Sequence, residues 1–97
     1  MRVDVLPEAH VELIDAIVYY ESAHIGLGDR FNHDFWEALD RIIEFPEAAS
    51  EIEDGVRRAR LTDFPFGIVY VNRGDMILIV AIMHLHRKPG YWRVRLR

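Results

Sequence analysis

The chain has 97 residues, no cysteine and 51% hydrophobic residues, so we expect one domain and exclude disulfide scaffolds, cysteine-ligated zinc sites and cysteine nucleophiles. Its longest apolar run, Met76–Met83, is too short to span a membrane, and no signal peptide is evident, so we expect a soluble cytoplasmic domain. The net charge of -4 divides unevenly: residues 1–54 contain fourteen acidic and three basic residues, whereas residues 55–97 contain two acidic and nine basic residues. All these nine except Lys88 are arginine, which favours bidentate contacts to carboxylates or phosphates over neutralisation within the fold.

The acidic half predicts a strand followed by two helices. Residues 2–6 alternate polar and apolar side chains, as a short strand does, and apolar residues then recur at helical spacing over residues 7–24. Two glycines within residues 26–28 interrupt this helix, and Asp29 is a candidate N-cap for a second one. The second helix should end one or two residues before Pro46.

The basic half predicts a sheet. Strands are expected at Val56–Leu61, Ile68–Val71 and Met76–Leu85, with Asn72–Asp75 as a hairpin connection. The apolar last strand should be covered on both faces. We therefore expect a single α+β domain over residues 1–97, in the order β-α-α-β-β-β, with a helical hairpin packed on one face of a small, mostly antiparallel sheet.

A cationic surface is expected on the other face of that sheet. Arg58 and Arg60 alternate with apolar residues along their strand, so they should share the face that the helices leave free. The basic and aromatic tail, residues 86–97, approaches this face, and His84 shares a strand face with His86. Such a surface suits a phosphate backbone or an acidic protein segment.

A family likeness extends over essentially the whole chain. The residues that carry it are Tyr19, Tyr20, Pro46, Arg57, Arg58, Arg60, Leu61, Phe64, Pro65, Phe66, Ile68, Tyr70, Ile77, Ile79, Ala81, His84, Arg87, Pro89, Tyr91 and Trp92. With these residues the sequence resembles the RelE/ParE superfamily of toxins from bacterial type II toxin–antitoxin systems, and within it the ParE-like branch. One departure is Phe66, which stands where the family commonly has tyrosine.

The resemblance implies a toxin that a cognate antitoxin keeps silent by covering its functional groove. ParE-like members poison DNA gyrase, whereas RelE-like members cut messenger RNA in the ribosomal A site, and a shared fold does not choose between them. We expect a ParE-like toxin that inhibits gyrase by binding and not by catalysis. The alternatives are a ribosome-dependent mRNA endonuclease and an inactive homologue that binds only the antitoxin.

Two sets of residues are candidates for these roles. The residues expected to bind the antitoxin or the target are Arg57, Arg58, Arg60, Tyr70, Arg87 and Trp92. A nuclease would instead use His84 as a base or acid, a phosphate clamp of Arg58, Arg60 and Arg87, and a tyrosine, Tyr91 or Tyr70, as proton donor.

Both sets also have a structural interpretation. His84 and Arg87 would fix the tail onto the sheet, with Trp92 packed there, and the arginines of residues 57–60 would form salt bridges to the acids of residues 51–54. Exposed pairs of that kind contribute only about 0–1 kcal/mol.

Two histidine-containing motifs have metal-ligand spacing. They are Glu21-x-x-His24 and His84-x-His86, and neither is accompanied by further ligands at suitable spacing. We therefore expect no metal and no cofactor.

Overall fold

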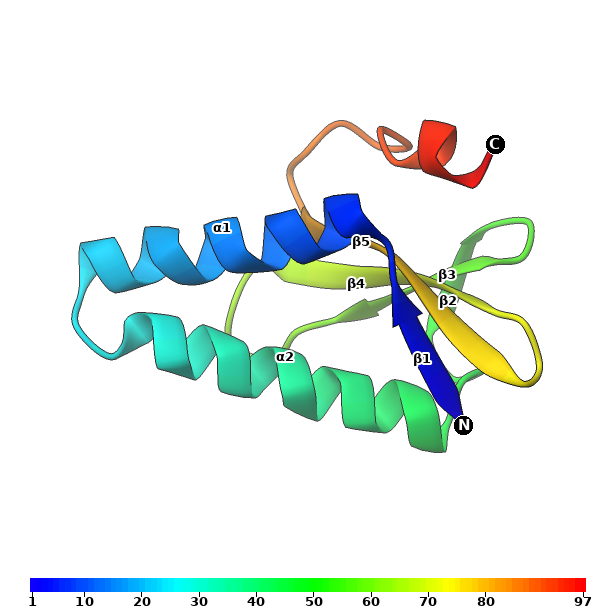
Figure 1. Ribbon diagram of the computed structural model, residues 1–97, viewed down its shortest axis with the longest axis horizontal. Coiled ribbons are helices and arrows are strands. Elements are labelled where there is room, and N and C mark those ends of the chain that lie inside the picture. The colour runs from blue at the N-terminus through cyan, green and yellow to red at the C-terminus, as the bar shows by residue number, and fades with distance from the viewer.

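Two helices lie on one side of a five-stranded sheet in the computed structural model, which describes all of residues 1–97 (Figure 1). The elements are β1 (Arg2–Val5), α1 (Pro7–Ala23), α2 (Leu27–Glu44), β2 (Ser50–Glu53), β3 (Val56–Arg60), β4 (Phe66–Asn72), β5 (Met76–His84) and a 3-10 helix, η1 (Arg93–Leu96). The strand order is β1-β5-β4-β3-β2, and only β1 pairs in parallel, with β5. The predicted α+β class and helical hairpin are confirmed.

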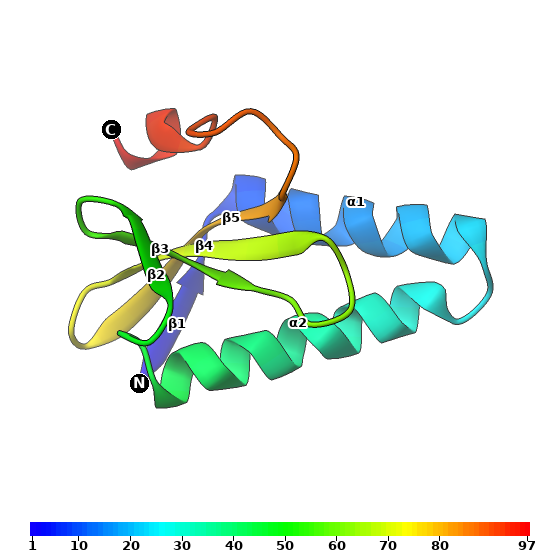
Figure 2. The same ribbon diagram turned by 180° about the vertical axis from the view of Figure 1, so that it is seen from behind.

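The turn between the helices is built around a glycine and a glutamate. Gly26 has a φ of 89°, in the left-handed region that favours glycine, and it occupies the N-cap position of α2. The predicted N-cap, Asp29, is therefore wrong, because α2 begins at Leu27 and Asp29 lies inside its first turn. The Glu21 carboxylate supplies the cap instead by accepting the backbone N–H groups of Gly26 at 3.1 Å and Gly28 at 3.0 Å. The tip of the hairpin projects beyond the sheet (Figures 1 and 2).

The edge strand β2 is one that the sequence did not predict. It consists of the polar stretch Ser50–Glu53 and pairs antiparallel with β3 through a turn in which Gly55 has a φ of 76°. The Glu51 carboxylate accepts the Gly55 N–H at 2.8 Å and fixes this turn. Because β2 pairs only with residues 56–58 of β3, the last two residues of β3 have an open edge.

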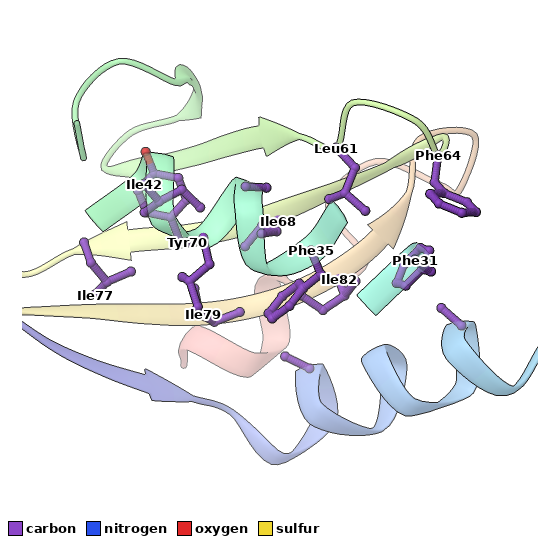
Figure 3. Packing of buried hydrophobic residues seen from close by; sticks show 14 residues of the cluster. Phe31, Phe35, Ile42, Leu61, Phe64, Ile68, Tyr70, Ile77, Ile79 and Ile82 are labelled. Atoms are coloured by element: carbon purple, nitrogen blue, oxygen red, sulfur yellow. The ribbon is translucent and has the colours of Figure 1, made fainter. Parts of the chain in front are cut away.

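The sheet is covered on both faces. Its helix-facing side carries a core to which α1, α2 and β3–β5 contribute; the labelled members in Figure 3 are Phe31, Phe35, Ile42, Leu61, Phe64, Ile68, Tyr70, Ile77, Ile79 and Ile82. A smaller core on the opposite side contains Val56, Val69, Val80, Ala81, Met83 and Trp92. The C-terminal segment covers this second core, so β5 is buried on both faces, as predicted.

The turn between β3 and β4 is held by one buried carboxylate. Asp34 of α2 is 2% exposed, and its two oxygens accept the N–H groups of Thr62 at 3.0 Å and Asp63 at 2.8 Å. Neither helix combines the length and apolar character needed to cross a membrane.

We expect the Asp34→Ala substitution to lower the free energy of unfolding by about 1–3 kcal/mol, because it leaves two backbone donors of a partly buried turn without their acceptor. Urea denaturation measures the loss. The matched variant is Asp40→Ala, at an exposed position of the same helix, which should change stability by less than about 0.5 kcal/mol. Equal losses in the two variants would show that the contacts to the turn contribute nothing.

Candidate functional site

Arg58 and Arg60 lie on the face of the sheet that the helices do not cover. They pair across β3 and β4 with Val69 and Gly67, and Val69 belongs to the core on that side. The Arg58 side chain packs closely over Gly67, since a Cβ there would lie 2.8 Å from Cγ of Arg58. The placement expected from strand alternation is therefore confirmed for both arginines.

A groove of about 420 Å³ lies where the C-terminal end of α2 faces the open edge of β3. Its lining residues are Arg41, Ile42, Phe45, Ala48, Ala49, Ser50, Arg58, Ala59, Arg60 and Tyr70. The apolar part includes Phe45, whose side chain is 60% exposed. None of the three arginines forms a salt bridge within the chain. An unpaired strand edge, an apolar wall and uncompensated guanidinium groups together suit an extended segment that carries carboxylates.

Two predicted site residues, Arg57 and Tyr70, hold the chain segment that forms one wall of this groove. Arg57 donates hydrogen bonds to the carbonyl oxygens of Glu47 at 3.0 Å and Ala49 at 2.7 Å, and the Tyr70 hydroxyl donates to the Pro46 carbonyl at 2.7 Å. These three bonds hold the segment between α2 and β2 against the sheet. Burial raises the pKa of Tyr70, so its hydroxyl remains a donor.

Neither Tyr70 nor Trp92 is available for the direct partner contact that the sequence predicted. Tyr70 is fully buried beneath the helices, and Trp92 is buried in the second core. This part of the prediction is corrected, because both aromatic side chains pack inside the protein and support the surface from below.

The tail is clamped by Glu12, a residue that the sequence analysis did not single out. Its carboxylate accepts hydrogen bonds from Tyr91 at 2.7 Å, from Arg95 at 2.7 and 3.0 Å, and from the Ile82 N–H at 3.1 Å, and Arg87 lies 3.4 Å away. The C-terminal segment therefore returns alongside the start of α1 (Figure 1). No local signal distinguishes Glu12, because Glu8 and Asp15 are acids on the same side of the helix.

The clamp fixes the ionisation of its members. Burial alone would raise the pKa of Glu12, but hydrogen bonds from Arg95, Tyr91 and the Ile82 N–H outweigh it and hold the pKa below its ordinary value of 4.5. Burial and the hydrogen bond to Glu12 raise the pKa of Tyr91. The Tyr91 hydroxyl therefore stays protonated and donates its hydrogen bond to Glu12.

His84 lies on the helix-facing side of the sheet, opposite to Arg58 and Arg60. It pairs with Phe66, whose ring contacts the core under the helices, and the two rings are 5.1 Å apart. Its Nδ1 accepts the His86 N–H at 3.1 Å. The residues of the predicted nuclease are thus divided between two faces of the sheet. His84 and Arg87 line one small pocket with Glu12. Arg58 and Arg60 lie on the opposite face. This arrangement corrects the predicted constellation.

Comparison with known proteins finds a likeness among solved structures. No family model matches the chain, and no curated protein matches it. Among solved structures, a chain described as "Chromosomal ParDE TA system from P. aeruginosa" matches with a TM-score of 0.71 and 22% sequence identity, over 89% of this chain and 97% of that chain. At that identity the likeness shows the fold, which is the RelE/ParE-like α+β fold that the sequence predicted.

Proposed function

We propose that this chain, whose fold is that of the ParDE protein, is the toxin of a type II toxin–antitoxin system and that its released form inhibits DNA gyrase. The sequence resemblance and the shared fold support a toxin. The groove at the edge of β3 gives the strongest support, because Arg41, Arg58 and Arg60 line it and form no salt bridge within the chain.

The antitoxin segment that fits this groove is extended, acidic and partly apolar. Its backbone would add to the open edge of β3, and its carboxylates would pair with Arg58 and Arg60. An apolar side chain would cover the exposed ring of Phe45. The complex is therefore a hetero-oligomer of toxin and antitoxin, and the antitoxin neutralises by occupying the surface.

Gyrase is favoured over messenger RNA by the division of the nuclease residues. Cleavage needs a base, an acid and a cationic clamp around one phosphate. Here His84 is separated from Arg58 and Arg60 by the sheet, and Tyr91 is bound to Glu12. A toxin that acts by binding gyrase on DNA needs no such constellation, and it would act in the cytoplasm, where gyrase meets the chromosome.

Two assays on the purified protein test the proposed target. The protein should inhibit supercoiling of relaxed plasmid by gyrase and should leave messenger RNA intact on programmed ribosomes. His84→Ala should inhibit gyrase as strongly as the unchanged protein, because the proposed binding surface does not include His84.

Messenger RNA cut in the ribosomal A site, with cutting lost in His84→Ala, would overturn the gyrase assignment in favour of the nuclease. Antitoxin binding without an effect in either assay would identify an inactive homologue.

A further inference from the structure

The helix α1 is apolar on two opposite sides. Its inner side packs on the sheet through residues that include Ala9 and Ala16. Its outer side carries Val11, Ile14 and Val18, which are 58%, 47% and 57% exposed and follow a spacing of three and four residues. Isolated exposed apolar side chains are ordinary, but a stripe of three on the solvent side of a helix is characteristic of a helix that packs on both sides.

A hollow lies beside the first half of this stripe. It has a volume of about 630 Å³ and is lined by Val5, Pro7, His10, Val11, Ile14 and Asp15. Val5, at the end of β1, is itself 44% exposed. The outer face of α1 is therefore concave at its start, so a side chain from another molecule can be inserted there.

The exposed charges that α1 itself places beside the stripe are negative, and the basic residues nearest to them, Arg87 and Arg95 of the tail, pair with Glu12. Glu8 and Asp15 are exposed and form no salt bridge, and α1 contains no lysine or arginine. The remaining central acid, Glu12, is already neutralised by Arg95 on the tail side. A second copy of the chain placed face to face would bring acid against acid, and an anionic lipid surface would be repelled.

We propose that the outer face of α1 is a docking surface for an amphipathic helix of a partner protein whose apolar stripe is flanked by lysine or arginine. The partner's apolar side chains pack on Val11, Ile14 and Val18, and its basic residues pair with Glu8 and Asp15. This surface is separate from the arginine groove: α1 packs over β5, whereas the groove lies at β3 and the end of α2. The proposal therefore does not depend on the toxin assignment, and both surfaces can be occupied together.

Two designed helical peptides test the surface. Both carry the same leucine stripe, one flanked by lysine and the other by glutamate, and fluorescence anisotropy measures their binding to the full chain. The lysine peptide should bind at least about tenfold more tightly than the glutamate peptide at low salt, since charge complementarity selects between them. Ile14→Asp combined with Val18→Asp should abolish binding, whereas Val94→Asp, at an exposed apolar residue of the tail, should not.

A charge reversal provides a test that does not alter the apolar stripe. Glu8→Lys combined with Asp15→Lys should make the glutamate peptide the tighter ligand, whereas Asp40→Lys combined with Glu44→Lys, at exposed positions of α2, should leave the preference unchanged. Circular dichroism melting checks that each variant is folded.

Three results would overturn the proposal. The first is equal binding of the two peptides, and the second is binding that persists in folded Ile14→Asp/Val18→Asp protein. The third is a dimer in light scattering that Ile14→Asp/Val18→Asp converts to monomer, because the occupant would then be a second copy of the chain.

Discussion

Replacing Arg58 and Arg60 together with alanine is expected to weaken binding of the cognate antitoxin by about 100-fold at low salt, because two charge-assisted contacts from residues that line the groove are lost. The remaining affinity should also depend less on salt, since the deleted interactions are the ones that ions screen. Isothermal titration at two salt concentrations measures both effects. The fold should persist, because neither side chain forms a salt bridge within the chain.

The control for this experiment is the pair Arg30→Ala and Arg73→Ala, which removes the same charge at exposed positions outside the groove. It should change the affinity by less than about threefold, through the long-range field alone. Equal weakening by the two double variants would mean that the antitoxin responds to net charge and not to the groove. Unchanged affinity in Arg58→Ala/Arg60→Ala would place the antitoxin elsewhere on the protein.

The Glu12→Gln substitution should produce the largest loss of stability, about 2–3 kcal/mol at neutral pH. This figure lies between the roughly 0–1 kcal/mol of an exposed ion pair and the about 3–5 kcal/mol lost when a fully buried pair is broken. The Glu12 and Arg95 side chains are 13% and 12% exposed, so the pair falls between these two limits. Urea denaturation measures it, and Glu37→Gln, at an exposed residue of α2, is the matched control.

The same substitution should change the acid stability of the protein. Because the fold holds the pKa of Glu12 below 4.5, the ionised carboxylate stabilises the native state fully above the unfolded-state pKa, and this contribution is lost as the pH falls through the lower native-state pKa. The difference in unfolding free energy between the native chain and Glu12→Gln should therefore be constant near neutrality and shrink below about pH 4.5. A difference that does not change with pH would show that the ionisation of Glu12 does not stabilise the clamp.

The sequence predicts well those helices and strands whose own apolar side chains show the pattern of the element. The apolar spacing of both helices and the apolar run of β5 are such cases, and all three lie within a few residues of their predicted bounds. The strand β2 was missed because Ser50–Glu53 has one apolar residue and is a strand only through its pairing with β3. Asp29 resembled a cap, but the left-handed backbone of Gly26 takes that position.

The candidate site was only partly predictable, for a similar reason. Strand alternation placed Arg58 and Arg60 correctly. The partners of Arg87 and Tyr91 depend on the path of the C-terminal segment across the fold. A contact between residues 12 and 95 cannot be predicted from a local sequence pattern, because the two residues are far apart in the chain. Tyr70 also looked like a surface residue, because its partner, the Pro46 carbonyl, comes from a loop distant in the chain.

We propose a toxin whose arginine groove binds the antitoxin. The most direct measurement is the growth of cells that express it alone or together with the protein encoded by the neighbouring reading frame. The chain alone should arrest growth, the neighbour should restore it, and Arg58→Ala/Arg60→Ala protein should still arrest growth but no longer be rescued. Normal growth with folded, accumulated chain would contradict the toxin assignment, and full rescue of the double variant would contradict the groove.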